Sequence, residues 1–206
     1  MKRFAFAAAI YAALFSSAQA QTIVDEWASV KAPPPVELKK VTVDPSTTAF
    51  LVLDLLNANG SEQRRPRCVA SVPKVTKFLG EARNRKMTVV HSITVTTKVE
   101  DLDPRVAPQA GEPVVQTVAN KFIRTDLDKI LKERGIKTVI VSGTAAQGAV
   151  LFTASEAAFL GYKVIVPVEG STSELLYGEQ AVAWLLANAP GVGANTTLTS
   201  FDMIGF

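Results

Sequence analysis

The sequence predicts a three-layer αβα sandwich around a parallel β-sheet, and three observations support this fold class. From about residue 48, short apolar runs rich in Val and Ile alternate with segments of helical spacing. The apolar runs are nearly continuous, which is typical of strands buried on both faces. Several of them end on polar or small residues, as strands of parallel sheets do where ligands bind. Alternating strands and helices of this kind indicate a parallel sheet covered by helices on both faces.

Each predicted strand is a short apolar, often β-branched run, and each predicted helix has apolar residues three and four positions apart. Strands are expected at residues 48–54, 87–95, 137–142, 163–168 and 196–199. Helices are expected from Ser71 as N-cap, from 125 to a stop at Gly135, from 147 to 160, and from Ser173 to about 187. Residues 96–120 interrupt the alternation, and a long insertion of this kind commonly forms a wall or lid of an active site.

The start of the chain has the features of a secretory signal in residues 1–20. Lys2 and Arg3 precede an apolar stretch, and Ala18-Gln19-Ala20 is a small-residue cleavage site. The apolar stretch is shorter than the roughly 20 residues of a membrane-spanning helix. We therefore expect export, to the periplasm, with no membrane attachment after cleavage, and an uncleaved membrane anchor is the alternative. Residues 21–46 are proline-rich and aperiodic, so we expect an extended N-terminal arm before a single domain over residues 47–206.

Charge and composition exclude several classes of function. The net charge of +3 falls to +1 once Lys2 and Arg3 are removed with the signal, so nothing indicates a nucleic-acid partner. Cys68 is the only cysteine and His91 the only histidine, which excludes an intrachain disulfide and a His/Cys metal cluster. We expect a small-molecule substrate, no metal and no other cofactor.

Two strand endings contain the first candidates for a site. Residues 49–54 end on the carboxylate of Asp54, and residues 137–142 lead into a turn of small residues at 143–149. The carboxyl ends of parallel strands lie at one edge of a sheet, so both endings are expected to face one pocket. Asp54 is therefore the first candidate for acid or base catalysis.

These segments resemble the isochorismatase-like (cysteine hydrolase) superfamily. The resemblance covers residues 47–206 and rests on Leu53-Asp54-Leu55-Leu56-Asn57, on Phe122-Ile123-Arg124-Thr125-Asp126-Leu127, and on Gly143 to Ala154. It implies the isochorismatase-like hydrolase fold with its Rossmann-like sheet, and a catalytic triad of Asp, Lys and Cys. Together with the proline-rich arm, it also suggests a homo-oligomer.

The chain departs from this pattern at two triad positions. Asp54 matches the aspartate, but Ala149 stands where the resemblance implies the nucleophilic cysteine, and Gln116 where it implies the lysine. Alanine cannot form a thioester, and glutamine cannot carry the positive charge that would stabilise a carboxylate. Lys121 is close in sequence and could replace the lysine, or it could point to solvent.

Members of the family without the cysteine are implied to hydrolyse a vinyl ether, with an aspartic acid that protonates the alkene carbon. We therefore predict cysteine-independent hydrolysis of a vinyl ether, amide or lactam, with Asp54 as the general acid/base. The resemblance also implies a cis bond between Thr144 and Ala145, and an anion hole formed by the backbone N–H groups of Ala145 and Ala149. Asn57 and Phe122 are further candidates for substrate binding.

Other interpretations stay open. Gln116 and Ala149 also fit a small-molecule binding protein, a pseudoenzyme that keeps the fold without turnover. Cys68 could be a displaced nucleophile, although a lone cysteine is more often a buried small hydrophobe. His91 could turn toward the pocket or lie in the core. The run Arg64-Arg65-Pro66-Arg67 would suit a carboxylate-bearing substrate, a subunit contact or a solvated loop.

Overall fold

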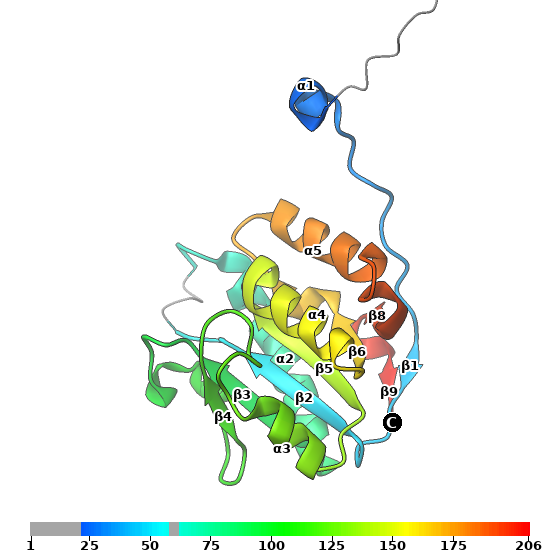
Figure 1. Cartoon of the computed structure of the whole chain (residues 1–206). Helices are drawn as coiled ribbons and strands as arrows, with labels where there is room; N and C mark the ends of the chain where they lie inside the picture. The colour runs from blue at the N-terminus through cyan, green and yellow to red at the C-terminus, as the bar shows by residue number, and fades with distance from the viewer. Residues whose placement is uncertain (1–21, 58–61) are drawn as a thin grey trace, which may run out of the picture. The chain divides into compact units, whose positions relative to one another are not determined.

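A seven-stranded sheet forms the centre of the domain, and its neighbouring strands follow the order β4-β3-β2-β5-β6-β8, with β7 paired to the end of β5 (Figure 1). Every pairing within this sheet is parallel, as predicted. The computed structural model describes residues 22–57 and 62–206. The strands are β2 (Thr48–Leu53), β3 (Thr88–Ile93), β4 (Val114–Gln116), β5 (Thr138–Thr144), β6 (Lys163–Pro167), β7 (Ser171–Thr172) and β8 (Thr196–Thr199).

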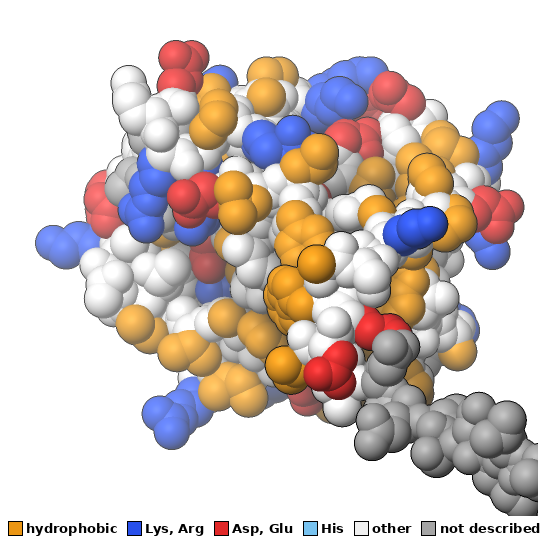
Figure 2. Space-filling model, turned by 90° about the horizontal axis from the view of Figure 1, so that it is seen from above, with side chains coloured by type: hydrophobic (Ala, Val, Ile, Leu, Met, Phe, Trp, Pro, Cys, Tyr) orange, Lys and Arg blue, Asp and Glu red, His pale blue; other side chains and the backbone are white. Residues whose placement is uncertain are grey.

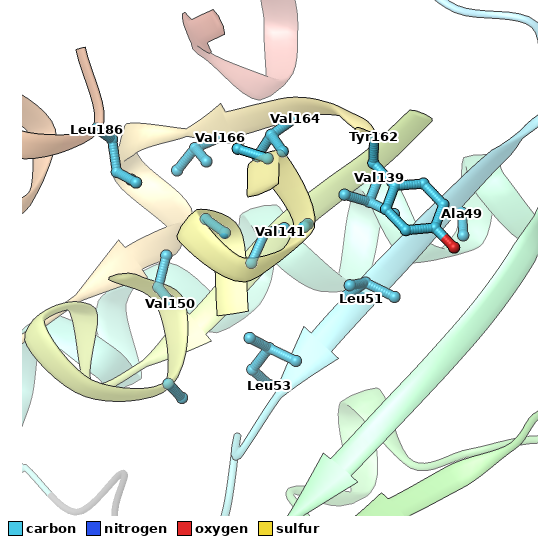
Figure 3. Close-up of a cluster of buried hydrophobic side chains, with 14 of the residues drawn as sticks. Ala49, Leu51, Leu53, Val139, Val141, Val150, Tyr162, Val164, Val166 and Leu186 are labelled. Atoms are coloured by element: carbon cyan, nitrogen blue, oxygen red, sulfur yellow. The ribbon is translucent and has the colours of Figure 1, made fainter. Parts of the chain in front are cut away.

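Helices cover both faces of this sheet, which confirms the predicted αβα sandwich. Successive residues of a strand point to opposite faces, so the sheet has a core cluster on each side. Three helices pack on one face, and the longest helix packs on the other. Leu51 and Leu53 of β2 lie on the first face with Val141 of β5 (Figure 3). The helices on that face are α3 (Leu127–Glu133), α4 (Leu151–Phe159) and α5 (Leu176–Asn188), and α2 (Pro66–Asn84) covers the other.

On the second face of the sheet, aromatic side chains pack between β2, α2 and the C-terminal residues. Phe50 of β2 meets Phe78 of α2 edge to face, with ring centroids 5.0 Å apart, and Phe201 packs against Phe78 with tilted rings whose centroids are 5.1 Å apart. Phe201 belongs to the 3₁₀ turn η7 (Phe201–Met203), which leads into β9 (Ile204–Gly205). The C-terminal residues therefore complete the core on the α2 side of the sheet.

The compact unit that contains the sheet includes residues before the first long strand. It spans Pro35–Phe206, because β1 (Val41–Thr42) pairs with β9 and because Val36 and Leu38 pack against the core. The preceding unit includes a short helix α1 (Ile23–Glu26) and the turn η1 (Trp27–Ser29) where only an extended arm was expected. The signal predicted for residues 1–20 lies outside the described residues.

The start of α2 differs from the prediction. The helix begins at Pro66, where proline's missing N–H costs nothing, rather than after Ser71. Ser71 is buried inside the helix, and its hydroxyl donates to the carbonyl oxygen of Cys68 at 2.8 Å, so it is not an N-cap. Pro73 lies within the helix, although its position in the sequence suggested a helix start.

Two later helices begin further along the chain than predicted. Residues 146–150 form a π-type turn, so the helix predicted from residue 147 begins at Leu151, and the last helix begins three residues later than expected, at Leu176. Strands β4 and β7 lie where no strand was predicted. Within the described residues, none of the helices has the length and apolar character that crossing a bilayer requires. The short turns are η2 (Val99–Asp101), η3 (Pro104–Val106), η4 (Ala146–Val150), η5 (Val168–Gly170) and η6 (Gly193–Asn195).

Candidate active site

Asp54 lies directly beyond the carboxyl end of β2 and has a positive φ of 51°. Asp adopts this left-handed conformation more readily than most residues other than Gly. The backbone is fixed on both sides, because the Asp54 N–H donates to the Ser92 carbonyl oxygen at 3.3 Å and its own carbonyl accepts from Leu56 at 2.8 Å. The sharp turn thus positions the carboxylate at the edge of the sheet.

Gly143 allows β5 to approach β2 closely at this edge. It pairs with Leu53, the last residue of β2, and has a φ of 148°. A Cβ atom at this position would clash with the Leu53 carbonyl oxygen, so only glycine fits. The following residues, Thr144 and Ala145, thereby reach the cavity that Asp54 lines.

Asp54 forms a buried ion pair with Lys121. Its Oδ2 lies 2.7 Å from Lys121 Nζ, and the exposed fractions of the two side chains are 7% and 0%. The Ser92 hydroxyl donates to Oδ1 at 2.8 Å, and Lys121 Nζ also donates to the Val118 carbonyl oxygen at 3.0 Å. Such additional hydrogen bonds are needed to offset the desolvation of two buried charges.

Helix α4 holds the loop that carries Lys121. The Lys121 N–H donates to Thr153 Oγ1 at 3.1 Å, and the Asn120 amide donates to the Glu156 carboxylate at 3.3 Å. Both acceptors belong to α4. The side chain of Lys121 therefore extends from a loop that is fixed on two sides.

The expectation that Gln116 takes the place of the lysine beside Asp54 is wrong. Gln116 is exposed at the end of β4, and its amide donates to the carbonyl oxygens of Thr94 and Thr97 at 3.1 and 2.8 Å. Lys121, from the loop that follows β4, supplies the ammonium instead. Asp54 thus has the charged neighbour that Gln116 alone could not have provided.

A cavity of about 230 Å³ lies at this edge of the sheet. Its wall unites three of the predicted site residues, Asp54, Ala145 and Ala149, with polar side chains from other loops. Its volume is below the roughly 300 Å³ at which ordinary small-molecule sites begin, so it suits a small substrate. The lining residues are Asp54, Arg65, Thr94, Val95, Thr117, Val118, Ala119, Thr144, Ala145 and Ala149.

The turn after β5 has the expected backbone. The peptide bond between Thr144 and Ala145 is cis, as the resemblance implied. The Ala145 carbonyl oxygen accepts from the N–H groups of Gly148 and Val150 at 3.0 and 3.4 Å, which closes the turn η4. Ala149 of this turn lines the cavity, and its side chain carries no nucleophile.

Asn57 and Phe122, the other predicted substrate-binding residues, are not among the residues that line the cavity. Asn57 is exposed, and its side-chain amide donates to the Leu102 carbonyl oxygen at 3.3 Å. Phe122 stacks on Tyr162 with ring centroids 6.3 Å apart. Both residues thus have structural contacts in the folded chain.

The thiol of Cys68 is buried in α2, with 1% of the residue exposed, and does not line the cavity. Burial raises its pKa, although the hydroxyls of Thr172 and Thr144 and the charge of Arg65 act in the opposite direction. A raised pKa leaves less of the reactive thiolate at neutral pH. The geometry therefore disfavours Cys68 as a nucleophile.

His91 lies in the core of the sheet rather than in the cavity. It is fully buried, and its Nε2 is 2.8 Å from Glu112 Oε2. Arg83 holds the same carboxylate through two hydrogen bonds of 2.7 and 2.8 Å. Burial lowers the pKa of His91, more than Glu112 raises it, so the neutral ring is favoured.

Sequence reasoning missed the polar partners of the site. Ser92 belongs to the strand predicted at residues 87–95, where it pairs with Leu53 and so lies next to Asp54. A single serine at the carboxyl end of a buried strand was the available signal. In the described part of the chain, no group of three or more His, Cys, Asp or Glu side chains is arranged to hold a metal ion.

Sequence comparison shows similarity to an amidase and to an isochorismatase effector. N-carbamoylsarcosine amidase of Arthrobacter sp is 38% identical over 69 residues, which cover 33% of this chain and only 26% of that protein. The secreted isochorismatase effector Isc1 of Verticillium dahliae is 29% identical over 141 residues, covering 60% of this chain and 74% of that protein.

Structure comparison finds solved proteins with a similar fold and similar names. An isochorismatase-like hydrolase from Alkaliphilus metalliredigens has a TM-score of 0.67 and 28% identity, covering 76% of this chain and 95% of that one. N-carbamoylsarcosine amidase from Thermoplasma acidophilum has a TM-score of 0.66 at 20% identity, covering 76% and 97%, and shares the fold. The isochorismatase domain model matches residues 48–197, most of the chain. The protein therefore belongs to the isochorismatase-like hydrolase family.

Proposed function

We propose that this protein is an exported hydrolase that cleaves a C–N or C–O bond of a small molecule, using Asp54 for proton transfer and no cysteine. The observation that carries this proposal is the buried ion pair of Asp54 and Lys121, whose carboxylate lines the cavity. Ala149 lines the same cavity, so the nucleophile has to be water rather than a side chain at that position.

For an amide or lactam, the proposed reaction uses the Asp54 carboxylate, two backbone N–H groups and the Lys121 ammonium. Asp54 accepts a proton from water as the water oxygen attacks the carbonyl carbon. The N–H groups of Ala145 and Ala149 donate to the carbonyl oxygen while negative charge develops on it. Asp54 then returns the proton to the leaving nitrogen as the C–N bond breaks, and Lys121 stabilises the carboxylate throughout.

A vinyl ether would use the same residues in a different order. Asp54 would carry a proton to the alkene carbon, and water would add to the resulting oxocarbenium ion. The ammonium of Lys121 stabilises negative charge on Asp54 at 2.7 Å, which fits a carboxylate base better than a proton donor. Amides and lactams are therefore the first substrates to test, and the amidases among the relatives support this order.

A small-molecule binding protein on the same fold is the second candidate. Ala149 favours it, because a cavity without a side-chain nucleophile retains shape and hydrogen-bond donors even if turnover has been lost. The two candidates differ in one observable property, namely whether a bound amide or vinyl ether is consumed.

The proposed location is the periplasm, and the proposed assembly is a homo-oligomer. Export is supported by the signal-like residues 1–20 and by the secreted relative. Oligomerisation is supported by large apolar side chains that are exposed on α5, at Leu176, Tyr177 and Trp184. Figure 2 shows several groups of hydrophobic side chains on one face of the molecule.

A turnover screen of the mature protein on small amides, lactams and vinyl ethers tests the proposal. The Cys68→Ala variant is run in parallel, because alanine keeps a small apolar group at this buried position. We expect hydrolysis of at least one compound, at the same rate in both proteins. Loss of turnover in Cys68→Ala contradicts the cysteine-free mechanism. Thermal stabilisation by a compound that is never hydrolysed supports the binding protein instead.

A further inference from the structure

Arg65 is the charged residue of the cavity wall that the proposed reaction leaves without a role. It is the N-cap residue of α2 and lines the cavity together with Asp54 and Ala149. Its Nη1 donates to Thr144 Oγ1 at 3.2 Å, and the Thr144 hydroxyl donates in turn to the Thr172 carbonyl oxygen at 3.2 Å. The guanidinium is therefore held against the carboxyl end of β5.

This guanidinium has an unused donor. Its Nε is buried, and within the described residues it has no hydrogen-bond partner. Arg67, Arg83 and Arg105 each use Nε and Nη2 to hold both oxygens of one carboxylate. The ion pairs formed by residues 22–57 and 62–206 include no carboxylate bound to Arg65. A buried N–H without a partner is costly, and a ligand that accepts from it would remove that cost.

The charges at the cavity also leave Arg65 uncompensated. The negative charge of Asp54 is matched by Lys121 at 2.7 Å, so the pair contributes no net charge. Arg65 then gives the wall a surplus positive charge. An anion in this partly enclosed site would gain both Coulomb attraction and charge-assisted hydrogen bonds.

We propose that Arg65 binds a carboxylate group of the substrate and so selects small anionic substrates over neutral ones. This inference rests on the proposed function, which places the bond to be cleaved beside Asp54 and Ala149. The fork of a guanidinium matches the geometry of a carboxylate, which can accept two parallel hydrogen bonds from it. The carboxylate and the bond to be cleaved would then both lie at the cavity of about 230 Å³, which suits a small molecule that carries both.

Binding of acids and of their uncharged amides tests this proposal without requiring turnover. The two probe pairs are benzoate with benzamide and malonamate with malonamide, titrated by calorimetry into the mature protein. We expect at least one acid to bind about tenfold or more tightly than its amide, as a charge-assisted contact predicts. Arg65→Gln should remove this preference. Arg67→Gln is the matched control and should keep it, because Arg67 pairs with Glu179 outside the cavity wall.

Several results would overturn the inference. They are the absence of a preference for the acid in both pairs, and a preference that survives in Arg65→Gln. Thermal melts establish that each variant is folded, and Arg65→Lys, which keeps the charge but not the fork, should retain part of the preference. A preference for acids without any hydrolysis contradicts the proposed function alone. Hydrolysis of an anionic amide such as malonamate at equal rates by the original protein and Arg65→Gln contradicts this inference alone.

Discussion

The carboxylate of Asp54 has a buried hydrogen-bond donor beside each of its two oxygens. Lys121 lies 2.7 Å from one oxygen, and the Ser92 hydroxyl lies 2.8 Å from the other. Both donors are buried, so the protein rather than bulk water provides the surroundings of the carboxylate. Groups fixed in this way need no reorganisation when a proton is transferred, which is a large part of enzymatic rate enhancement.

Removal of Lys121 tests how far the site depends on this pair. Lys121→Met leaves Asp54 buried without its cation, so we expect the free energy of unfolding to fall by about 3 kcal/mol or more, with loss of turnover. Urea unfolding at neutral pH measures the change. Lys132→Met is the matched control, because its pair with Asp128 is exposed (62% and 34%) and should change stability by less than about 0.5 kcal/mol. Equal effects of the two variants would contradict the role of the buried pair.

At the scale of secondary-structure elements, the carboxylate of Glu112 links the segment before β4 to both α2 and β3. Glu112 accepts two hydrogen bonds from Arg83 of α2 and lies 2.8 Å from His91 of β3. Burial alone would raise the pKa of Glu112, but the hydrogen bonds from Arg83, the Gln109 N–H and His91 outweigh it and lower the pKa to about 2. This contact holds the insertion against the sheet that carries the site.

The stability of the protein should therefore depend on pH through Glu112. Its pKa is about 2 in the folded chain and near the ordinary 4.5 when unfolded, so its contribution is complete above about 4.5 and is lost as the pH falls toward 2. We expect Glu112→Gln to be less stable than the original protein at neutral pH and to lose less stability on acidification. Urea unfolding from pH 7 to pH 3 measures this, with exposed Glu133→Gln as the control. Parallel pH profiles for Glu112→Gln and the original protein would refute the assignment.

The five longer strands were predictable, because buried parallel strands are continuous apolar runs bounded by turn residues. The two- and three-residue strands β1, β4, β7 and β9 were not, because runs this short have no readable pattern. The start of α2 and the lysine beside Asp54 were not predictable either. Pro73 suggested a helix start, but α2 begins at Pro66 and continues through Pro73. The resemblance places Gln116 at the position of the lysine, but Gln116 lies at the end of β4 and away from Asp54. The loop that follows β4 instead brings Lys121 to Asp54 through tertiary contacts with α4, which no local pattern reveals.

At the scale of the whole molecule, the fold is carried by the unit Pro35–Phe206. The first residues that pack against its core are Val36 and Leu38, and each of residues 22–35 is exposed. The sequence placed the start of the domain at residue 47 because residues 35–46 lack periodicity. Pairing of Val41–Thr42 with Ile204–Gly205 could not be predicted, since both strands have only two residues.

A chain that starts at Pro35 should keep both fold and activity. Since residues 22–34 bury no side chain in the core, we expect its melting temperature to match that of the mature protein to within about 2 °C, less than a loss of 1 kcal/mol would cause in a domain of this size. Scanning calorimetry of the two proteins at equal concentration measures this. A large drop in melting temperature would show that the N-terminal segment contributes to stability, for example between subunits.

The measurement that most directly tests the central claim is kcat/KM of Asp54→Asn on the best substrate from the screen. Asparagine keeps the size of the side chain but cannot accept the proton, so we predict a loss of about 10²-fold or more, the usual contribution of a general acid or base. Asp128→Asn is the matched control, since Asp128 pairs with Lys132 and Tyr162 outside the cavity and should retain the original rate. An Asp54→Asn variant that retains most of the original rate would contradict catalysis by Asp54.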